Sequence, residues 1–237
     1  MGRSFVVVEG HGEVDAVLNL LHRLSEDLGF EGTVWALGGR CNALLRRDRV
    51  LQECEKLRAR RDCDRVLFLQ DDEDGCPKDD GPRMASWIRE AALPFPAAVT
   101  LFYREYETLF LPCLPAMAGK TLRDGRGREL HPLHADARFD GDPEGPRDAK
   151  KVLSRFFPTN HPYRETTHQV ALTRLLDFAA LRSSGLPSFG TLERAHRFIL
   201  AATASGTYPV GTDGGSTGPG ATSAVRCGDP GTHPRRL

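Results

Sequence analysis

The sequence lacks several features that would assign it to a class of protein at once. Its 32 basic and 32 acidic side chains give a formal net charge of zero, so no general attraction to nucleic acid is expected. Binding of DNA or RNA must therefore use a local patch or a partner protein. No apolar stretch is long enough to cross a bilayer, and the N-terminus leads into a predicted strand without the features of a signal peptide. We expect a cytoplasmic protein with no membrane association.

Closely spaced cysteine pairs are also missing. The six cysteines are dispersed, and none forms the C-x-x-C pair that is typical of a zinc site. The composition, 40% hydrophobic and 27% charged, is ordinary for a globular protein. A chain of 237 residues is long enough for one sizeable domain, or for one domain with a smaller appendage.

Predicted strands and helices alternate in the first half of the chain. Short β-branched and aromatic runs predict strands at residues 5–8, 33–37, 65–70 and 98–103, the second ending at a Gly-Gly pair. Apolar residues at helical spacing predict helices between these strands. This alternation predicts an α/β fold, in which a mainly parallel β-sheet is flanked by helices on both faces.

The second half changes in character, and the whole chain divides into four predicted parts. Residues 1–115 form the sheet domain, and residues 116–147, rich in Gly, Arg, Asp and Pro, form a loop-rich insertion. Helical patterns resume in residues 148–202, including one over 167–182, and predict a helical C-terminal portion. Residues 203–237 are rich in Gly, Thr, Ser and Pro, which predicts a disordered tail.

Acidic residues follow three of the predicted strands. The carboxyl ends of parallel strands share one edge of a sheet, so we expect these side chains to meet there. They would repel one another unless a cation lay between them, and hard dications such as Mg²⁺ or Mn²⁺ fit oxygen ligands best. The sequence therefore predicts a metal-dependent phosphodiester site. The candidate ligands are Glu9, Asp71, Glu73, Asp74, Glu105 and Glu107.

A hydrophobic strand ending in Glu-Gly, a helix, and a later strand ending in an Asp-x-Asp-like cluster together resemble the TOPRIM domain. Topoisomerases, bacterial primases and nucleases of the overcoming-lysogenization-defect type share that domain. The chain most resembles an uncharacterised bacterial TOPRIM-like family of unknown function, over about residues 5–202. The residues that carry this resemblance are Val8-Glu9-Gly10-His-Gly12-Glu13, Asp71-Asp-Glu-Asp-Gly-Cys76-Pro77, Arg104-Glu105-Tyr-Glu107-Thr-Leu-Phe-Leu111 and Pro187-Ser188-Phe189.

The resemblance implies roles for these residues. Glu9 corresponds to the general acid/base or metal ligand of the first strand, and Asp71 with Glu73 to the Mg²⁺-binding pair. Glu73 departs from the pattern, in which Asp is usual, so the position of that ligand is open. Nucleases that use two metals need a further carboxylate, which Glu13 supplies as a second catalytic candidate.

The predicted site is completed by cations and by partners. Lys78 and Arg104 are candidate phosphate clamps. Members of the resembled family tend to be encoded beside AAA or ABC-type ATPases, which implies an ATPase partner. The resulting hypothesis is an endonuclease dependent on Mg²⁺ or Mn²⁺, with DNA favoured over RNA as the substrate and the choice between the two left open by the sequence. It would serve as the effector of an ATPase-coupled bacterial system aimed at phage or other foreign DNA.

Other interpretations stay open on the sequence alone. The chain lacks the extra domains that a topoisomerase or a primase needs. It can still be a non-catalytic metal-binding or nucleic-acid-binding subunit of an ATPase, or a nucleotide-binding enzyme that uses the glycine-rich segment 10–15. Glu105 or Glu107 can instead cap the helix that follows. The arginine-rich helix expected over residues 42–60 can contact a phosphate backbone, or be an ordinary solvated surface.

Overall fold

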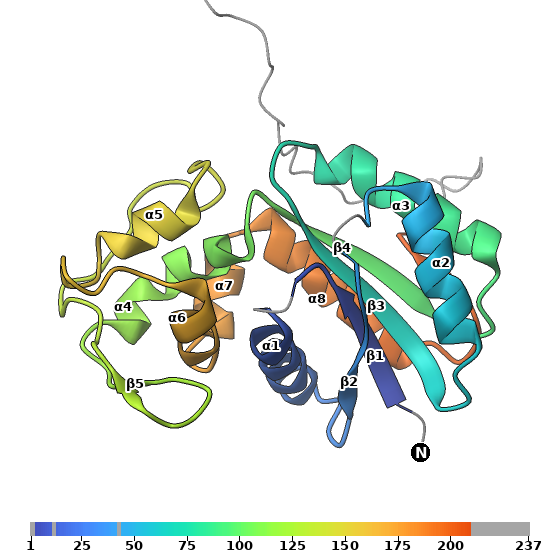
Figure 1. Ribbon diagram of the computed structural model, residues 1–237, viewed down its shortest axis with the longest axis horizontal. Helices are drawn as coiled ribbons and strands as arrows, with labels where there is room; N and C mark the ends of the chain where they lie inside the picture. Colours follow the sequence, from blue (N-terminus) through green and yellow to red (C-terminus); the bar gives the residue numbers. More distant parts are fainter. Residues whose placement is uncertain (1–2, 11–12, 42–43, 210–237) are drawn as a thin grey trace, which may run out of the picture.

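The computed structural model describes residues 3–10, 13–41 and 44–209 of the chain. At its centre is a five-stranded sheet with the order β2-β1-β3-β4-β7, in which every pairing is parallel (Figure 1). The predicted α/β class with a mainly parallel sheet is therefore confirmed. The strands are β1 (Arg3–Val8), β2 (Trp35–Arg40), β3 (Cys63–Asp72), β4 (Ala97–Tyr103) and β7 (Thr207–Tyr208).

Helices cover both faces of this sheet, and each face has its own hydrophobic core. On one face α1 (Val14–Asp27) and α8 (Pro187–Ala201) pack against Val6 and Val8 of β1. On the other face α2 (Arg47–Arg58) and α3 (Pro77–Ala91) pack against Phe5 and Val7. The two sets of β1 residues alternate because successive side chains of a strand point to opposite faces.

The same alternation along β3 decides where its acidic end points. Leu67 and Leu69 belong to the core on the α1 and α8 face, whereas Phe68 belongs to the core under α2 and α3. The strand was expected to end at residue 70 but continues to Asp72. Asp71 is therefore directed toward the face of α1, and Asp72 toward the face of α3.

Strand β2 also differs from the prediction, because the Gly-Gly pair lies inside it rather than ending it. A Cβ atom on Gly38 would lie 3.1 Å from Cβ of Phe5 and 3.2 Å from Cδ2 of Leu57. The glycine thus permits a close approach between β2, β1 and α2, and makes no turn here.

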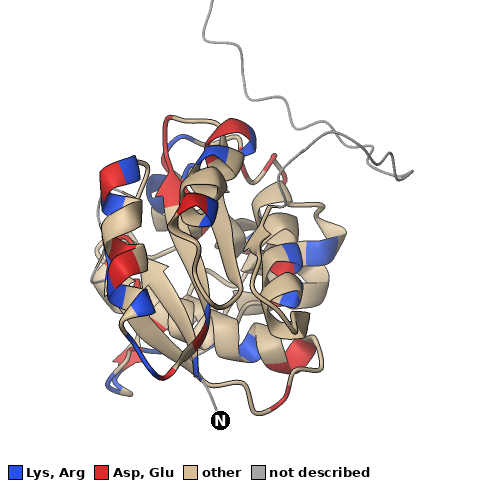
Figure 2. Ribbon diagram, turned by 90° about the vertical axis from the view of Figure 1, so that its right-hand side faces the viewer, with Lys and Arg blue, Asp and Glu red and all other residues tan. Residues whose placement is uncertain are grey.

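Basic side chains of helix α2 form ion pairs with acidic side chains of α2 itself and of α3. Arg47 forms an ion pair with Glu90 of α3, and Lys56 pairs with Glu53 at 2.6 Å. Figure 2 looks onto this side of the molecule and shows acidic and basic positions mixed along its helices. This arrangement favours a solvated surface over a basic stripe for nucleic acid.

The elements formed by residues 106–183 gather beside the sheet, on the left of Figure 1, and we call them the helical part. They are the 3₁₀ helix η1 (Tyr106–Cys113), α4 (Leu114–Met117), the hairpin of β5 (Leu122–Arg123) and β6 (Glu129–Leu130), α5 (Ala149–Ser154), α6 (Glu165–Thr173) and α7 (Phe178–Ser183). The helix predicted over residues 167–182 is two helices. The carboxylate of Asp177 accepts hydrogen bonds from the backbone of Ala179 and Ala180, and so starts α7 as a new helix.

The predicted disordered tail differs at its beginning. Residues 203–209 are described, and Thr207–Tyr208 forms β7, which pairs with Ala97 and Ala98 of β4. Residues 210–237, the rest of that predicted tail, lie outside the described residues. Within the part of the chain that the structure describes, no helix is both long and apolar enough to cross a bilayer.

Candidate functional site

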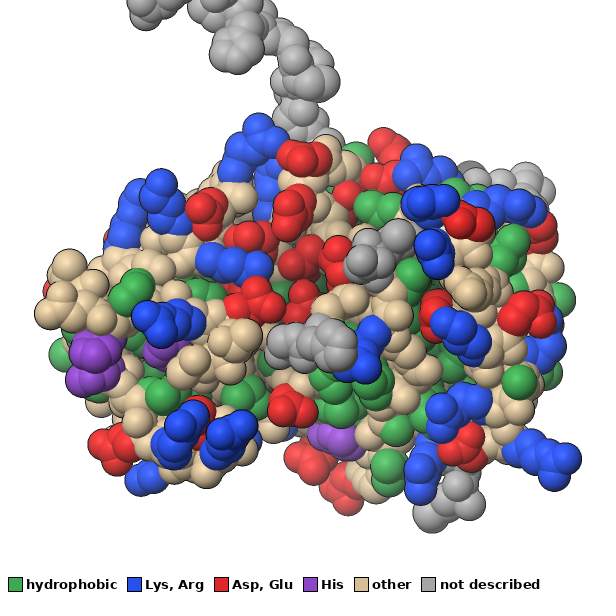
Figure 3. Space-filling view, viewed as in Figure 1, with side chains coloured by type: hydrophobic (Ala, Val, Ile, Leu, Met, Phe, Trp, Pro, Cys, Tyr) green, Lys and Arg blue, Asp and Glu red, His purple; other side chains and the backbone are tan. Residues whose placement is uncertain are grey.

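Carboxylates from separate segments meet between the sheet and the helical part. Glu9 follows β1, Glu13 precedes α1, and Asp71 lies near the end of β3. The charges of Glu13 and Glu107 raise the pKa of Asp71, and the charge of Glu9 raises the pKa of Glu13, so these groups face one another. We call the following set the acidic cluster: Glu9, Glu13, Asp71, Glu73, Glu105, Glu107 and Glu165. Figure 3 shows acidic side chains gathered in the middle of this face of the molecule.

Burial and mutual repulsion make these carboxyl groups hard to ionise. Burial, followed by the charges of Glu9 and Glu165, raises the pKa of Glu13 to about 7. Burial raises the pKa of Glu107 to about 7, and the pKa of Asp71 lies well above its ordinary value. Each shift means that the protein stabilises the neutral form of the acid relative to the carboxylate. A positive charge placed among these groups would reverse that preference.

One such charge is the ammonium group of Lys150, which comes from α5. Its Nζ lies 3.0 Å from Oε2 of Glu165, 3.8 Å from Oε1 of Glu105 and 4.0 Å from Oε2 of Glu107. Burial alone would lower the pKa of Lys150, but the charges of Glu107 and Glu165 outweigh it and raise that pKa. Lys150 is therefore a charged member of the site, and no sequence pattern singles it out.

Glu107 is completely buried, with 0% of its surface exposed. Its Oε1 accepts hydrogen bonds from the hydroxyl of Tyr163 at 2.8 Å and from Nε2 of Gln169 at 3.3 Å. Its Oε2 is buried and accepts no hydrogen bond from any residue that the structure describes, and its charged neighbour is the ammonium of Lys150 at 4.0 Å. A buried carboxylate oxygen without a partner is costly, and such atoms often coordinate an ion or serve catalysis.

Glu105 has a capping role, although not on the helix that follows it. Its Oε2 accepts hydrogen bonds from the backbone N–H of Ala149 at 2.8 Å and of Lys150 at 3.3 Å. It thus caps α5, which lies more than forty residues further along the chain. This contact fixes the start of α5, and with it the position of Lys150.

The next two predicted ligands, Glu73 and Asp74, separate from each other. The charge of Glu73 raises the pKa of Glu9, after the larger effect of burial, so Glu73 lies near Glu9 and belongs to the cluster. Asp74 is exposed and forms an ion pair with Arg147 at 2.5 Å. Asp74 contributes to none of the pKa shifts of the cluster described above, so the structure does not bring this candidate ligand together with the others.

Arg104, a predicted phosphate clamp, lies at the edge of the cluster. Its backbone adopts a φ of 73°, a left-handed conformation that is strained for a residue with a side chain. Its Nη1 donates a hydrogen bond to the carbonyl oxygen of Glu73 at 2.7 Å, and its guanidinium lies over the ring of Tyr103. Arg104 therefore positions the segment that carries Glu73.

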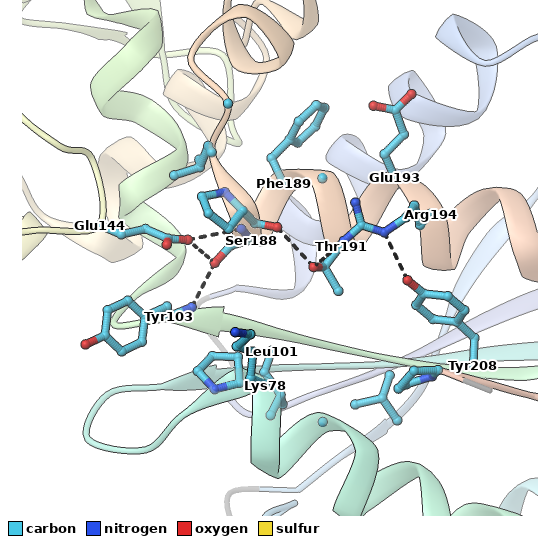
Figure 4. A pocket seen from close by; sticks show the side chains of 18 of the residues that line it. Lys78, Leu101, Tyr103, Glu144, Ser188, Phe189, Thr191, Glu193, Arg194 and Tyr208 are labelled. Carbon is cyan, nitrogen blue, oxygen red and sulfur yellow. Dashed lines mark hydrogen bonds between the residues drawn. The ribbon is translucent and has the colours of Figure 1, made fainter. Parts of the chain in front are cut away.

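Lys78, the other predicted clamp, lies elsewhere. It lines a separate cavity of about 540 Å³ between the start of α3, β4 and the start of α8 (Figure 4). None of the predicted metal ligands lines this cavity. The Ser-Phe pair at 188–189 lies here too, because Ser188 accepts a hydrogen bond from the backbone N–H of Tyr103 at 2.9 Å and donates one to Glu144.

Asp72 faces away from the cluster and has a structural task. One of its oxygens accepts a hydrogen bond from the backbone of Gly75 at 3.1 Å, and a Cβ atom on that glycine would clash with this same oxygen at 2.2 Å. Burial and the neighbouring carboxylate of Asp80 raise the pKa of Asp72 to about 6. This pair holds the loop between β3 and α3 and leaves Asp71 as the residue of β3 that enters the site.

Comparison with known proteins places this site in a family. A sequence model described as domain of unknown function (DUF4276) matches residues 8–195, which is most of the chain. The chain belongs to the DUF4276 family. A search of curated proteins gives no match. The family match spans every member of the acidic cluster as well as Lys150.

The acidic cluster of this DUF4276 chain offers oxygen ligands, the type that a hard dication prefers. No three or more His, Cys, Asp and Glu side chains of the described residues are arranged to hold a metal ion as they stand. The donor set nevertheless fits Mg²⁺ or Mn²⁺, because it consists of carboxylate oxygens and includes Oε2 of Glu107, which accepts no hydrogen bond within the described part of the chain. Glu9, Glu13, Asp71 and Glu107 are the residues that would hold such an ion.

The sequence had missed four side chains of this DUF4276 site: Lys150, Tyr163, Glu165 and Gln169. All four come from the helical part, 40 or more residues after the last predicted ligand. Lys150 and its exposed neighbour Lys151 have the same residue type and adjacent positions in the sequence, so no short sequence pattern distinguishes them. Only their contacts with Glu105 and Glu107 identify these residues.

Proposed function

We propose that this DUF4276 protein is an endonuclease that depends on Mg²⁺ or Mn²⁺ and cleaves phosphodiesters, in DNA rather than RNA. The observation that supports this most is the buried Oε2 of Glu107, which accepts no hydrogen bond from the described residues and lies among carboxylates that raise one another's pKa. Such a set is stabilised by a dication, and a dication is also what allows acidic residues to approach an anionic phosphate.

The residues of the cluster have different proposed roles. A bound Mg²⁺ or Mn²⁺ would supply Lewis-acid stabilisation of charge on the phosphoryl oxygens. Glu107 is the fully buried ligand, and Asp71 and Glu9 belong to the same set. Glu13 would complete the ligand set, and because burial and neighbouring charges raise its pKa to about 7 in the metal-free protein, binding of the dication would release its proton. Arg104 holds the Glu73 segment at the rim, where substrate would enter.

The fold supports the same proposal. A parallel sheet that brings the residues after β1 and near the end of β3 together is the arrangement that the TOPRIM resemblance implies. A relationship to TOPRIM nucleases, an AAA or ABC-type ATPase partner and a role against phage or other foreign DNA are parts of the proposal that rest on that resemblance.

The proposal predicts cleavage that requires a dication. Purified protein is incubated with plasmid, single-stranded DNA and tRNA in Mn²⁺ or Mg²⁺, with and without a candidate ATPase encoded nearby. We expect nicking or linearisation of plasmid in Mn²⁺, none in EDTA or Ca²⁺ alone, and less degradation of tRNA than of DNA. The readout is the loss of supercoiled DNA on a gel over time.

Two controls make the assay decisive. Glu9→Gln changes a member of the acidic cluster, whereas Asp79→Asn changes an exposed carboxylate in the first turn of α3. Equal cleavage by wild type and Glu9→Gln would show a contaminating nuclease and refute the proposal. Tight Mn²⁺ binding without cleavage of any substrate would favour the alternative of a non-catalytic, metal-binding subunit.

A further inference from the structure

Lys150 is held inside the acidic cluster by its backbone as well as by its charge. The N-terminus of α5 is capped by Glu105 through the N–H groups of Ala149 and Lys150 itself. The ammonium group then lies among Glu105, Glu107 and Glu165, at 3.0 to 4.0 Å from one oxygen of each. A lysine that merely snorkels on a surface would have neither the fixed backbone nor three carboxylate neighbours.

Glu107 lies nearer to this ammonium than Glu9, Glu13 and Asp71 do, although the charge of Lys150 also lowers the pKa of those three groups. Its Oε1 is occupied by Tyr163 and Gln169, which fixes the orientation of the carboxylate. Its Oε2 faces Lys150 at 4.0 Å, and the charge of Glu107 also acts on Asp71. One carboxylate between two positions for positive charge is the arrangement found in two-metal hydrolytic sites, where the ions are roughly 3.5–4 Å apart.

We propose that Lys150 fills the second cation position, so that the site binds one dication rather than two. This inference rests on the proposed function, because it assumes the metal position formed by Glu9, Glu13, Asp71 and Glu107. The ammonium supplies the positive charge beside Glu105, Glu165 and the shared Glu107. A second dication would have to displace a lysine whose backbone is anchored on Glu105, and the site therefore loads with a single ion.

The number of bound ions tests this inference directly. Mn²⁺ is titrated into the full-length protein, and free Mn²⁺ is measured by electron paramagnetic resonance, a readout that is independent of cleavage. We expect one bound ion per chain in wild type and two in Lys150→Met, because Glu105, Glu107 and Glu165 then lack a counter-charge. The two ions of the variant would also show magnetic coupling.

Matched variants control for the loss of a lysine as such. Lys151→Met removes the exposed neighbour on the same helix and should keep one ion. Lys150→Arg retains the positive charge and should also keep one ion, and it serves as the test if Lys150→Met does not fold. Thermal melting of each variant establishes that it is folded.

The outcomes separate this inference from the proposed function. Two ions in wild type, or a single ion in both Lys150→Met and wild type, would overturn the inference and leave metal-dependent cleavage standing. Two ions in Lys150→Arg would overturn it as well, because the retained charge should exclude the second ion. Failure of wild type to bind any Mn²⁺ would remove the metal site, and with it both proposals.

Discussion

Replacing Asp71 by asparagine should reduce Mn²⁺-dependent DNA cleavage by at least about 100-fold, because loss of an outer-shell contact to a metal site already costs roughly 10–100-fold and Asp71 is proposed as a direct ligand. Asparagine has almost the same shape as aspartate but cannot carry the negative charge that attracts the dication. The pKa of Asp71 is raised by burial and by Glu13 and Glu107, so the carboxylate is disfavoured in the metal-free protein. The Asp71→Asn protein should therefore melt at the same temperature as wild type or higher.

The Asp79→Asn variant is the matched control for this prediction. Asp79 lies eight positions further along, is exposed and belongs to α3, so its substitution should leave both cleavage and Mn²⁺ affinity unchanged. The measurements are initial rates of plasmid nicking and Mn²⁺ dissociation constants for the three proteins. If Asp71→Asn retained the rate of wild type, Asp71 would have no part in a catalytic site.

The second large effect concerns Glu107 and pH. The pKa of this fully buried carboxyl is about 7 in the folded protein, against an ordinary value of 4.5. Between these two pH values the folded state binds more protons at Glu107 than the unfolded state does. The stabilisation from protonated Glu107 is thus complete below pH 4.5 and is lost as the pH rises through 7. A shift of this size corresponds to about 3 kcal/mol, at 1.36 kcal/mol per pKa unit.

Glu107→Gln removes this titration while keeping an oxygen for Tyr163 and Gln169. In EDTA, the variant should gain stability relative to wild type as the pH is raised from 5 to 7.5, with a relative rise in melting temperature of roughly 5–10 °C. Other groups whose pKa shifts in the opposite sense, such as buried His196, are common to both proteins and cancel in the difference. Saturating Mn²⁺ at pH 7.5 should reverse the order, because it stabilises the protein that retains the carboxylate.

Thermal melting over this pH range, with and without Mn²⁺, checks both halves of the prediction. A difference between Glu107→Gln and wild type that does not vary with pH would mean that Glu107 is ionised in the folded protein throughout. A variant stabilised by Mn²⁺ as strongly as wild type would exclude Glu107 as a ligand.

Most of the fold could be predicted because it follows from local patterns. Buried runs such as Phe5–Val8 alternate with amphipathic helices, and that order alone implies a parallel sheet with helices on both faces. The Gly-Gly pair in β2 was misinterpreted because glycine serves both turns and close packing. Only the contact of Gly38 with Phe5 and Leu57 decides between these uses.

The candidate site was predictable only where it depends on the sheet. Glu9 and Asp71 lie at the same edge of the sheet because β1 and β3 are neighbouring parallel strands, and each interacts with Glu13. Asp74 and Lys78 were assigned from proximity in sequence, but the chain turns away after β3, toward Arg147 and toward the cavity beside α8. Lys150 and Glu165 enter from the helical part through tertiary contacts that no local sequence pattern encodes.

The central claim is that Glu9, Glu13, Asp71 and Glu107 hold a dication between the sheet and the helical part. A crystal of the full-length protein grown with Mn²⁺ tests it most directly, through the anomalous scattering of that ion. We predict one strong peak within roughly 2.0–2.4 Å of carboxylate oxygens of Asp71 and Glu107, a distance typical of hard cations in proteins, with Lys150 still beside Glu165. A peak beside Asp72 and Asp80, or none at saturating Mn²⁺, would contradict the account.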